Sequence, residues 1–576
     1  MRPTLTLNKK IPVHLLRYVT KQEYGQYSPV DQAVWRYVMR QNFHFLKGRA
    51  HDTYKSGLKK SGILIDRIPR MGEMNECLQS AGWEAVPVRG LIPASAFFGL
   101  LAHGFLPVPT GIRTLERIPY TPVHDLVHGA AGLAPMLFDE KYARYVRTLA
   151  QIGAKALSDA AERELFPVPR LLSAVNGAGE IAEAKTEVAQ TISQSKGISE
   201  AAQISRLYWW TAECGLIGNP ENPKIYGAGL LSSMRERQLC FSEATAKIPF
   251  DLETCIQTDY DVTRPQPHLF VCRDFDELIE AVSLFSERMA FRVGGTESLN
   301  KAVRSGDIAT AEYSTGLQVS GIFNLLLYNE QGEAIYLETF GPTALAYEGE
   351  ELPGHGKSTH SRGFGSPIGN VKDLPKPLEY FTPRDLHLYH MDRGREVELH
   401  FQNGIRIKGV VKDWIFRGNR LILLTLTACT VTYRDHALFL PEWGDYHLAA
   451  GGKIVSVFAG SADPASFYAD AIPEETEREQ TYPAMSTLDH LYQAVQDIRN
   501  GKESSTILPT IVRTLDDLYP EDWLLRIEIL ELCSRLPLFH NHAMKEQTKD
   551  HLFRLIQNKP GVKSFILNGL KLVSLP

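Results

Sequence analysis

The sequence predicts a mainly α-helical N-terminal domain, then a small β-rich, barrel-like module and a C-terminal helical bundle. Two changes in the spacing of apolar residues carry this prediction. The helical spacing gives way to alternation at about residue 320 and returns at about residue 485. We expect the three parts to span residues 1–315, 316–480 and 481–576. At roughly 150 residues per domain, a chain of 576 residues has room for them.

The N-terminal part contains two stretches with a clear helical signal. From Asp31 to Leu46 the apolar residues recur at helical spacing, which predicts an early helix. From Ala174 to Ser205 the chain is rich in Ala, Glu and Gln, with few large apolar side chains. Because such residues favour a helix without supplying a core face, we expect an exposed helical excursion there.

The middle part carries a hairpin signal. Apolar residues alternate over 397–401, Asn403-Gly404 follows, and alternation resumes at Ile405. An Asn-Gly pair between alternating stretches is typical of a tight β-turn, since both residues tolerate positive φ. The remaining elements of this half of the chain are a Gly-, Ser- and His-rich loop at 353–369, strands at 421–433 and 454–458, and helices carrying Leu488, Leu491, Val495, Ile498 and Leu525, Ile529, Leu532, Leu536.

Composition and charge exclude several classes of function. The net charge is −5 and charged residues make up 22%, so no basic field indicates nucleic acid as the partner. No apolar run approaches the roughly 20 residues that a membrane span needs. The first residues do not resemble a signal peptide, and the seven cysteines form no CxxC pair. We therefore expect a cytoplasmic protein without a membrane or nucleic-acid partner.

The stretch from Tyr120 to Tyr145, YTPVHDLVHGAAGLAPMLFDEKYARY, is the densest in chemically capable side chains. His124 and His128 are four residues apart, which on an α-helix places them about 40° apart around the axis. Two histidines at this spacing can share a metal ion. Glu213 lies in LYWWTAECGL, an aromatic and apolar helix where a buried carboxylate needs a cation or a metal.

A third segment, YGAGLLSSMRERQ, begins at Tyr226. Gly227 and Gly229 indicate a close approach of the backbone to a neighbour, and Ser232 supplies a hydroxyl group.

These segments together resemble a known family. The blocks YTPxxDLVH, AAGxAP, LYWWTAECGL, KIYGAGLLSS and IPFDLETCIQTDYDVTRPQPHLFV are similar, in order and spacing over about residues 80–290, to the pterin-dependent aromatic amino acid hydroxylases. That family includes the phenylalanine, tyrosine and tryptophan hydroxylases. The excursion near 174–205 and the long C-terminal part resemble a longer bacterial form.

The resemblance implies a mainly α catalytic domain that uses ferrous iron, Fe(2+), and a tetrahydropterin to activate dioxygen and hydroxylate an aromatic amino acid. Two histidines and one carboxylate hold the iron in this family, a geometry that leaves positions open for oxygen chemistry. The residues assigned by resemblance are His128 and Glu213 as iron ligands, Phe97 as the aromatic residue on which the pterin stacks, Arg113, Thr121 and Trp209 as substrate-binding residues, and Tyr208 and Ser232 as catalytic residues around the iron.

Two positions depart from the family pattern. The family's metal segment reads HExxGH, whereas this chain reads HGAAGL from His128 to Leu133. Leu133 takes the place of the second histidine ligand and cannot coordinate a metal. Gly129 takes the place of a glutamate that in the family contacts the pterin or its bound water.

His124 is the one candidate replacement, since the family usually has proline there. On an α-helix, Leu133, five residues after His128, would lie at about +140° from it, and His124, four residues before, at about −40°. The two would thus be on opposite sides of His128, which disfavours a simple replacement of the missing histidine by His124. Pro122 and a capping Asp125, however, place His124 before the helix. Three outcomes stay open: a rebuilt His124/His128/Glu213 site, a weakened two-ligand site, or no metal. We slightly prefer a surface histidine over a ligand at His124.

The leading hypothesis is a pterin-dependent monooxygenase with an altered metal site. Its rivals are a degenerate homologue that acts as a binding or regulatory protein, and a site that accepts a different ligand. A zinc peptidase is disfavoured, because His124 to His128 has Asp125 where the HExxH pattern has glutamate.

Overall fold

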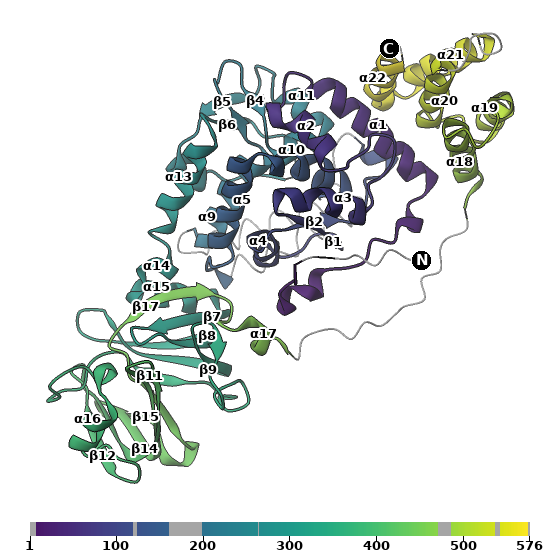
Figure 1. Ribbon diagram of the computed structural model, residues 1–576. Coiled ribbons are helices and arrows are strands. Elements are labelled where there is room, and N and C mark those ends of the chain that lie inside the picture. Colours follow the sequence, from purple (N-terminus) through teal and green to yellow (C-terminus); the bar gives the residue numbers. More distant parts are fainter. Residues whose placement is uncertain are drawn as a thin grey trace.

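The computed structural model describes residues 7, 9–118, 124–160, 198–262, 264–469, 485–535 and 542–573. Three parts follow one another along the chain (Figure 1). A mainly helical domain is followed by a β-rich part, and the C-terminal helices return to lie against α1 (Pro29–Leu46).

Most of the N-terminal domain packs into one large hydrophobic core. Its further helices are α2 (Asp52–Lys60), α3 (Met71–Leu78), α4 (Ala94–Ala102), α5 (Glu140–Gly153), α9 (Glu200–Tyr208), α10 (Ala228–Ser232), α11 (Met234–Leu239), α12 (Leu252–Gln257) and α13 (Phe275–Ser286). Its strands are the parallel pair β1 (Glu84–Val88) and β2 (Phe105–Pro109), and a sheet in the order β4-β3-β6-β5, formed by β3 (Leu216–Ile217), β4 (Lys224–Ile225), β5 (Ala246–Pro249) and β6 (His268–Cys272). The mainly α character of this domain agrees with the prediction.

Helix α1 confirms the early helix expected from the spacing of its apolar residues. Ser28 caps it by accepting the backbone N–H of Asp31, whose carboxylate in turn accepts the N–H of Ser28. Pro29 occupies the first helical position, where its missing N–H costs nothing. The buried face of this helix places Trp35 and Val38 in the core.

The β-rich part consists of two open sheets, so within the described ranges the barrel-like closure that we expected is not seen. One sheet has the order β10-β9-β8-β7-β17, with β11 added on β9; the other has the order β12-β13-β14-β15, with β16 added on β14. The strands are β7 (Ile308–Tyr313), β8 (Leu317–Tyr328), β9 (Ala334–Tyr347), β10 (Glu350–Glu351), β11 (Gly365–Pro367), β12 (Glu396–His400), β13 (Ile405–Arg417), β14 (Arg420–Tyr433), β15 (His436–Phe439), β16 (Tyr446–Ala449) and β17 (Ile454–Ala459).

The core of this part begins before residue 316, where we placed the boundary. Strand β7 lies in the first sheet, and the short helices α14 (Ala290–Val293) and α15 (Gly295–Ser305) pack against β17. Ala290 and Leu299 share one hydrophobic cluster with the strands. Two further short helices are α16 (Pro383–Leu388) and α17 (Pro464–Phe467).

The hairpin predicted at Asn403-Gly404 is confirmed, since β12 and β13 pair antiparallel across it. Gly404 has a φ of 91°, whereas Asn403 is not among the residues with positive φ, so the glycine alone supplies the left-handed turn. The stretches predicted at 421–433 and 454–458 form β14 and β17.

The C-terminal helices are α18 (Thr487–Arg499), α19 (Leu508–Leu518), α20 (Leu524–Arg535), α21 (His542–Asn558) and α22 (Lys563–Val573). Helices α18, α20 and α22 contact α1. Glu528 of α20 lies between Arg36 of α1 and Arg499 of α18, and all three side chains are buried. A buried ion cluster therefore joins the two ends of the chain.

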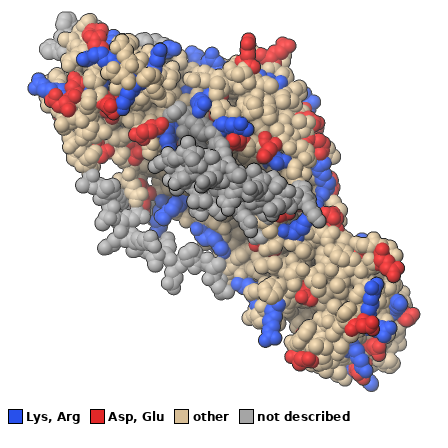
Figure 2. Space-filling view, turned by 180° about the vertical axis from the view of Figure 1, so that it is seen from behind, with Lys and Arg blue, Asp and Glu red and all other residues tan. Residues whose placement is uncertain are grey.

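The surface agrees with the balanced composition. Figure 2 shows basic and acidic side chains interspersed over the visible face. Among the described residues, no helix is both long enough and apolar enough to cross a membrane. The expected helical excursion at 174–205 lies outside the described residues except for its last part, which forms the start of α9.

Candidate metal centre

Three side chains from two separate segments converge in the N-terminal domain. His124, His128 and Glu213 each offer a potential ligand atom, and these atoms lie within 4.8 Å of one another. Glu213 Oε2 is 3.2 Å from His128 Nε2 and 3.7 Å from His124 Nε2. The two imidazole rings are stacked, with centroids 3.8 Å apart and planes inclined by 9°. The three residues named for a rebuilt His124/His128/Glu213 site therefore lie together, as one of the three outcomes left open by the sequence requires.

His128 belongs to a π-helical turn rather than the α-helix that we assumed. The turn spans Val127–Leu133, and π-helical hydrogen bonds join residues five apart, so His128 and Leu133 lie on nearly the same face. The α-helical angle of about 140° between them was therefore wrong. Leu133 is 1% exposed and belongs to the hydrophobic core.

His124 lies outside the helix, as the sequence predicted from Pro122 and Asp125. Asp125 accepts a hydrogen bond from the backbone N–H of His128 at 3.1 Å, which is the capping contact that we expected. The same carboxylate pairs side-on with Arg113, at 2.7 Å to Nε and 2.9 Å to Nη2. Burial raises the pKa of Asp125, but Arg113 outweighs burial and keeps the pKa below its ordinary value.

Glu213 is placed by a second π-helical turn, Trp209–Glu213, which continues α9. Gly227 and Gly229 lie against it: a Cβ on Gly227 would come within 2.5 Å of the Glu213 carbonyl oxygen, and one on Gly229 within 2.9 Å. The close approach predicted for these glycines is therefore confirmed. Burial alone would raise the pKa of Glu213, but His128 and His124 lower it to about 2. The carboxylate is thus ionised at neutral pH.

The two ring nitrogens of His128 face different groups, Nδ1 facing Ser232 and Nε2 facing Glu213. The Ser232 hydroxyl donates to the carbonyl of Gly229 at 3.3 Å, and its oxygen lies 3.2 Å from His128 Nδ1, where it can accept an N–H. When Nδ1 carries the proton and donates it there, the lone pair is on Nε2, which is buried and lies 3.2 Å from Glu213 Oε2. Oε1 of Glu213 is buried as well. Lone pairs that face each other at this distance are stabilised by a cation between them, so the donor set fits a metal ion.

Arg113 reaches the same region from the loop after β2. Its Nη1 donates to the carbonyl of Ser232 at 3.2 Å, and its guanidinium is 1% exposed. Two of its nitrogens, Nε and Nη2, already donate to Asp125. We did not predict this pairing, although Asp125 itself was expected to cap the helix.

Of the aromatic residues assigned by resemblance, Tyr208 lies beside Glu213 and Phe97 lies beside Tyr208. Phe97 of α4 meets Tyr208 edge-on, with centroids 5.4 Å apart, and Tyr208 lies close enough to help lower the pKa of Glu213. Trp209 is half-buried and stacks on Tyr260 at 4.5 Å, a partner that the sequence did not single out. Thr121 lies outside the described residues.

Gly129 is enclosed by strand β2. A Cβ added there would lie 3.1 Å from Val108 Cα and from Pro109 Cδ. A glutamate at this position, as in the family pattern, would press against this backbone. The packing around residue 129 therefore suits the glycine of this chain better than the glutamate of the family pattern.

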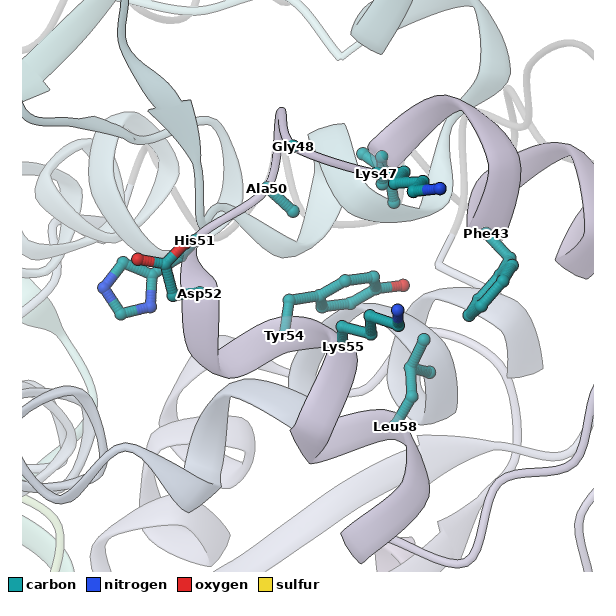
Figure 3. A pocket seen from close by; sticks show the side chains of 10 residues that line it. Phe43, Lys47, Gly48, Ala50, His51, Asp52, Tyr54, Lys55 and Leu58 are labelled. Carbon is teal, nitrogen blue, oxygen red and sulfur yellow. The ribbon is translucent and has the colours of Figure 1, made fainter.

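The pocket in Figure 3 lies elsewhere, between α1 and α2. It measures about 150 Å³ and is lined by residues that include Phe43, Lys47, Tyr54 and Lys55. The Tyr54 hydroxyl donates to the carbonyl of Ala131 at 3.0 Å and so supports the π-helical turn from behind. None of the residues assigned by resemblance lines this pocket.

Comparison with known proteins identifies the family. The family model described as biopterin-dependent aromatic amino acid hydroxylase matches residues 16–165 and 180–294. Phenylalanine-4-hydroxylase of Mesorhizobium japonicum is 32% identical over 267 residues, which are 46% of this chain and 82% of that protein. The Chromobacterium violaceum enzyme is 29% identical over 268 residues, 46% of this chain and 77% of that protein.

Solved structures give a similar match in sequence. The C. violaceum phenylalanine hydroxylase with bound iron(III) and 7,8-dihydrobiopterin is 28% identical, covers 47% of this chain and 85% of that chain, and has a TM-score of 0.37. This chain belongs to the biopterin-dependent aromatic amino acid hydroxylase family. That family is the enzyme class expected from the sequence: pterin-dependent monooxygenases of aromatic amino acids.

Proposed function

We propose that this protein hydroxylates an aromatic amino acid similar to phenylalanine, with a tetrahydropterin and dioxygen, at an iron ion held by His124, His128 and Glu213. The observation that carries the proposal is the convergence of the three side chains, with His128 Nε2 3.2 Å and His124 Nε2 3.7 Å from Glu213 Oε2. Two imidazoles and one carboxylate are the donor set that suits non-haem ferrous iron and leaves positions open for other ligands. In this proposal His124 takes the role of the family's second histidine, whose position is occupied here by Leu133. His124 precedes His128 in the chain, whereas the family histidine follows it.

Each residue around the cluster has a distinct part in this proposal. Bound iron would supply the activation of dioxygen beside the reduced pterin. Glu213 offsets the positive charge of the ion, and its low pKa keeps it ionised. Ser232 holds His128 in the tautomer that presents Nε2. Phe97, beside Tyr208, offers the pterin an aromatic face.

Arg113 and Trp209 serve the substrate in this proposal. The guanidinium is held by Asp125, which also caps the turn that carries His128. The arginine that receives the amino acid carboxylate is thus tied directly to the metal segment. Trp209, braced by Tyr260, forms an aromatic wall for the side chain of the substrate.

Turnover tests the proposal. The full chain is loaded anaerobically with ferrous iron and mixed with phenylalanine, a reduced tetrahydropterin and dioxygen, and the hydroxylated amino acid is quantified. We expect product from the wild type and at least about 100-fold less from Glu213→Gln, because loss of a direct ligand exceeds the 10–100-fold effect of losing a supporting contact. Glu221→Gln, on an exposed residue of the same domain, is the matched control and should retain full turnover.

A second candidate is a degenerate homologue that binds a small molecule without turning it over. The changes at Leu133 and Gly129 favour it, because both fall in the metal segment. In the same experiment this candidate predicts no product from the iron-loaded wild type with phenylalanine, tyrosine or tryptophan. Such a result would overturn the hydroxylase proposal.

A further inference from the structure

A second group of potential metal ligands lies in the β-rich part, outside the stretch that matches the family. His355, His360 and His447 each offer a nitrogen, and these atoms lie within 4.8 Å of one another. His355 and His360 come from the glycine-rich loop after β10, and His447 comes from β16 of the other sheet. The cluster therefore lies where the two sheets meet, near the hydrogen bond from Ala449 N to Ser366 Oγ.

The backbone holds each histidine in place. The carbonyl of His355 accepts from Leu345 N at 2.9 Å, and the carbonyl of His360 accepts from Thr343 N at 3.0 Å, so both residues are anchored to β9. His447 is paired with Thr425 in the ladder between β16 and β14. His355 and His360 are 9% and 4% exposed, and Phe364 packs edge-on against His360. Two of the three histidines are thus buried, and His447 is half-buried.

The spacing of the rings is that of imidazoles around one ion. When imidazoles bind a metal at 2.0–2.1 Å with tetrahedral angles, their bonding nitrogens lie about 3.3 Å apart and their ring centroids about 5 Å apart. His355 Nδ1 and His360 Nε2 are 3.2 Å apart. The ring centroid of His447 is 4.9 Å from that of His355 and 4.9 Å from that of His360, and the other two centroids are 5.5 Å apart.

The protonation states also suit metal binding. Burial is the main cause that lowers the pKa of all three histidines, to about 3 for His360 and about 4 for His447. Neutral imidazoles therefore present lone pairs at pH 7. His447 Nδ1 lies 3.1 Å from the hydroxyl of Thr425, and an N–H donated there leaves Nε2 free for the metal.

We propose that His355, His360 and His447 bind a divalent transition-metal ion, with zinc as the preferred ion. Three imidazoles without a carboxylate suit zinc and its neighbours better than magnesium or calcium, which prefer oxygen ligands. Three protein ligands leave a fourth position open to water. The ion clips the loop that carries His355 and His360 to strand β16, so it joins the two sheets.

Zinc binding to the full chain tests this proposal independently of the iron site. The background is the His128→Ala variant, which disables the other cluster. After chelator treatment, bound Zn²⁺ is measured by equilibrium dialysis against the metal alone. We expect one equivalent per chain in this background, and at least about 100-fold weaker binding when His360→Ala or His447→Ala is added. His436→Ala, an exposed histidine of the same part, is the matched control and should keep the equivalent.

A spectroscopic readout covers the case in which a variant does not fold. Cobalt(II) bound to the His128→Ala protein should give the intense visible bands of a tetrahedral site, and Zn²⁺ should abolish them. Unchanged zinc binding in a folded His360→Ala protein would overturn the proposal. So would the absence of tetrahedral cobalt bands, since the cluster would then be a hydrogen-bonded group of histidines only.

Discussion

Replacing Glu528 by glutamine should loosen the C-terminal helices from the hydroxylase domain. Glu528 accepts from Arg36 Nε at 3.0–3.1 Å and from Arg499 Nη2 at 3.0 Å. The exposed fractions of the side chains are 3% for Glu528, 1% for Arg36 and 8% for Arg499. Removing this charge leaves the buried Arg36 without its carboxylate partner and leaves Arg499 with Glu531 alone, which costs about 3–5 kcal/mol.

The lowered pKa of Glu528 leads to a similar free-energy cost for removing its charge. Burial would raise this pKa, but Arg36 and Arg499 lower it from 4.5 to about 2. At about 1.4 kcal/mol for each tenfold change in proton affinity, the charged form is favoured by about 3 kcal/mol. A lowered pKa stabilises the folded state above the ordinary pKa of glutamate, and this contribution is lost as the pH falls from about 4.5 towards 2. The wild type should therefore lose docking stability in that pH range, and Glu528→Gln should already lack it at pH 7.

Native-state hydrogen exchange measures this local opening, because the chain has several parts and a single unfolding transition is not expected. Amides of α18 and α20 should lose about 3 kcal/mol of protection in Glu528→Gln at pH 7. The exposed Glu546 of α21 supplies the control, since solvent screens its surface pair with Lys549 and the pair contributes little to stability. A loss below 1 kcal/mol in Glu528→Gln would refute the reasoning.

The remaining predictions concern the metal segment. Ser232→Ala removes the acceptor for His128 Nδ1 and should weaken iron binding about 10–100-fold, measured by anaerobic dialysis; an unchanged affinity would mean that Ser232 does not set the tautomer. Gly129→Glu restores the family residue, but its Cβ would lie 3.1 Å from Val108 and Pro109. We therefore expect this variant to be less stable than the wild type by about 1–3 kcal/mol in thermal unfolding. A stability equal to that of the wild type would contradict the packing argument. Leu133→His should change iron affinity less than about 10-fold in the same dialysis, because three ligands already converge; a gain of about 100-fold would show that the site lacks a ligand.

Much of the architecture could be predicted from the sequence because it follows from local patterns. The helix at Pro29–Leu46 is marked by its apolar spacing, and the hairpin by the glycine after Asn403. The β-rich part was found but its start was placed too late, since α15 has helical spacing and only the packing of Leu299 against the strands assigns it to that core. Local patterns do not report such long-range contacts.

The metal segment shows a different limit. Motifs alone singled out His128 and Glu213, and His124 was noticed as a gain, but the α-helical wheel placed Leu133 on the wrong face. No sequence rule used here predicts a π-helical turn, and within this turn Gly129 packs closely against β2 and Gly132 against Ala228. The cluster of His355, His360 and His447 could not be predicted for a related reason. His447 is distant from the other two in the sequence, and the three come together only where the two sheets meet.

The affinity of the His124→Ala variant for iron tests the central claim most directly. Ferrous iron is titrated anaerobically into the full chain, into His124→Ala and into His44→Ala, which changes an exposed histidine of α1. If His124 replaces the missing family ligand, His124→Ala should bind iron at least about 100-fold more weakly, or about 2.8 kcal/mol, while His44→Ala binds as the wild type does. An iron affinity equal to that of the wild type in a folded His124→Ala protein would contradict the rebuilt three-residue centre.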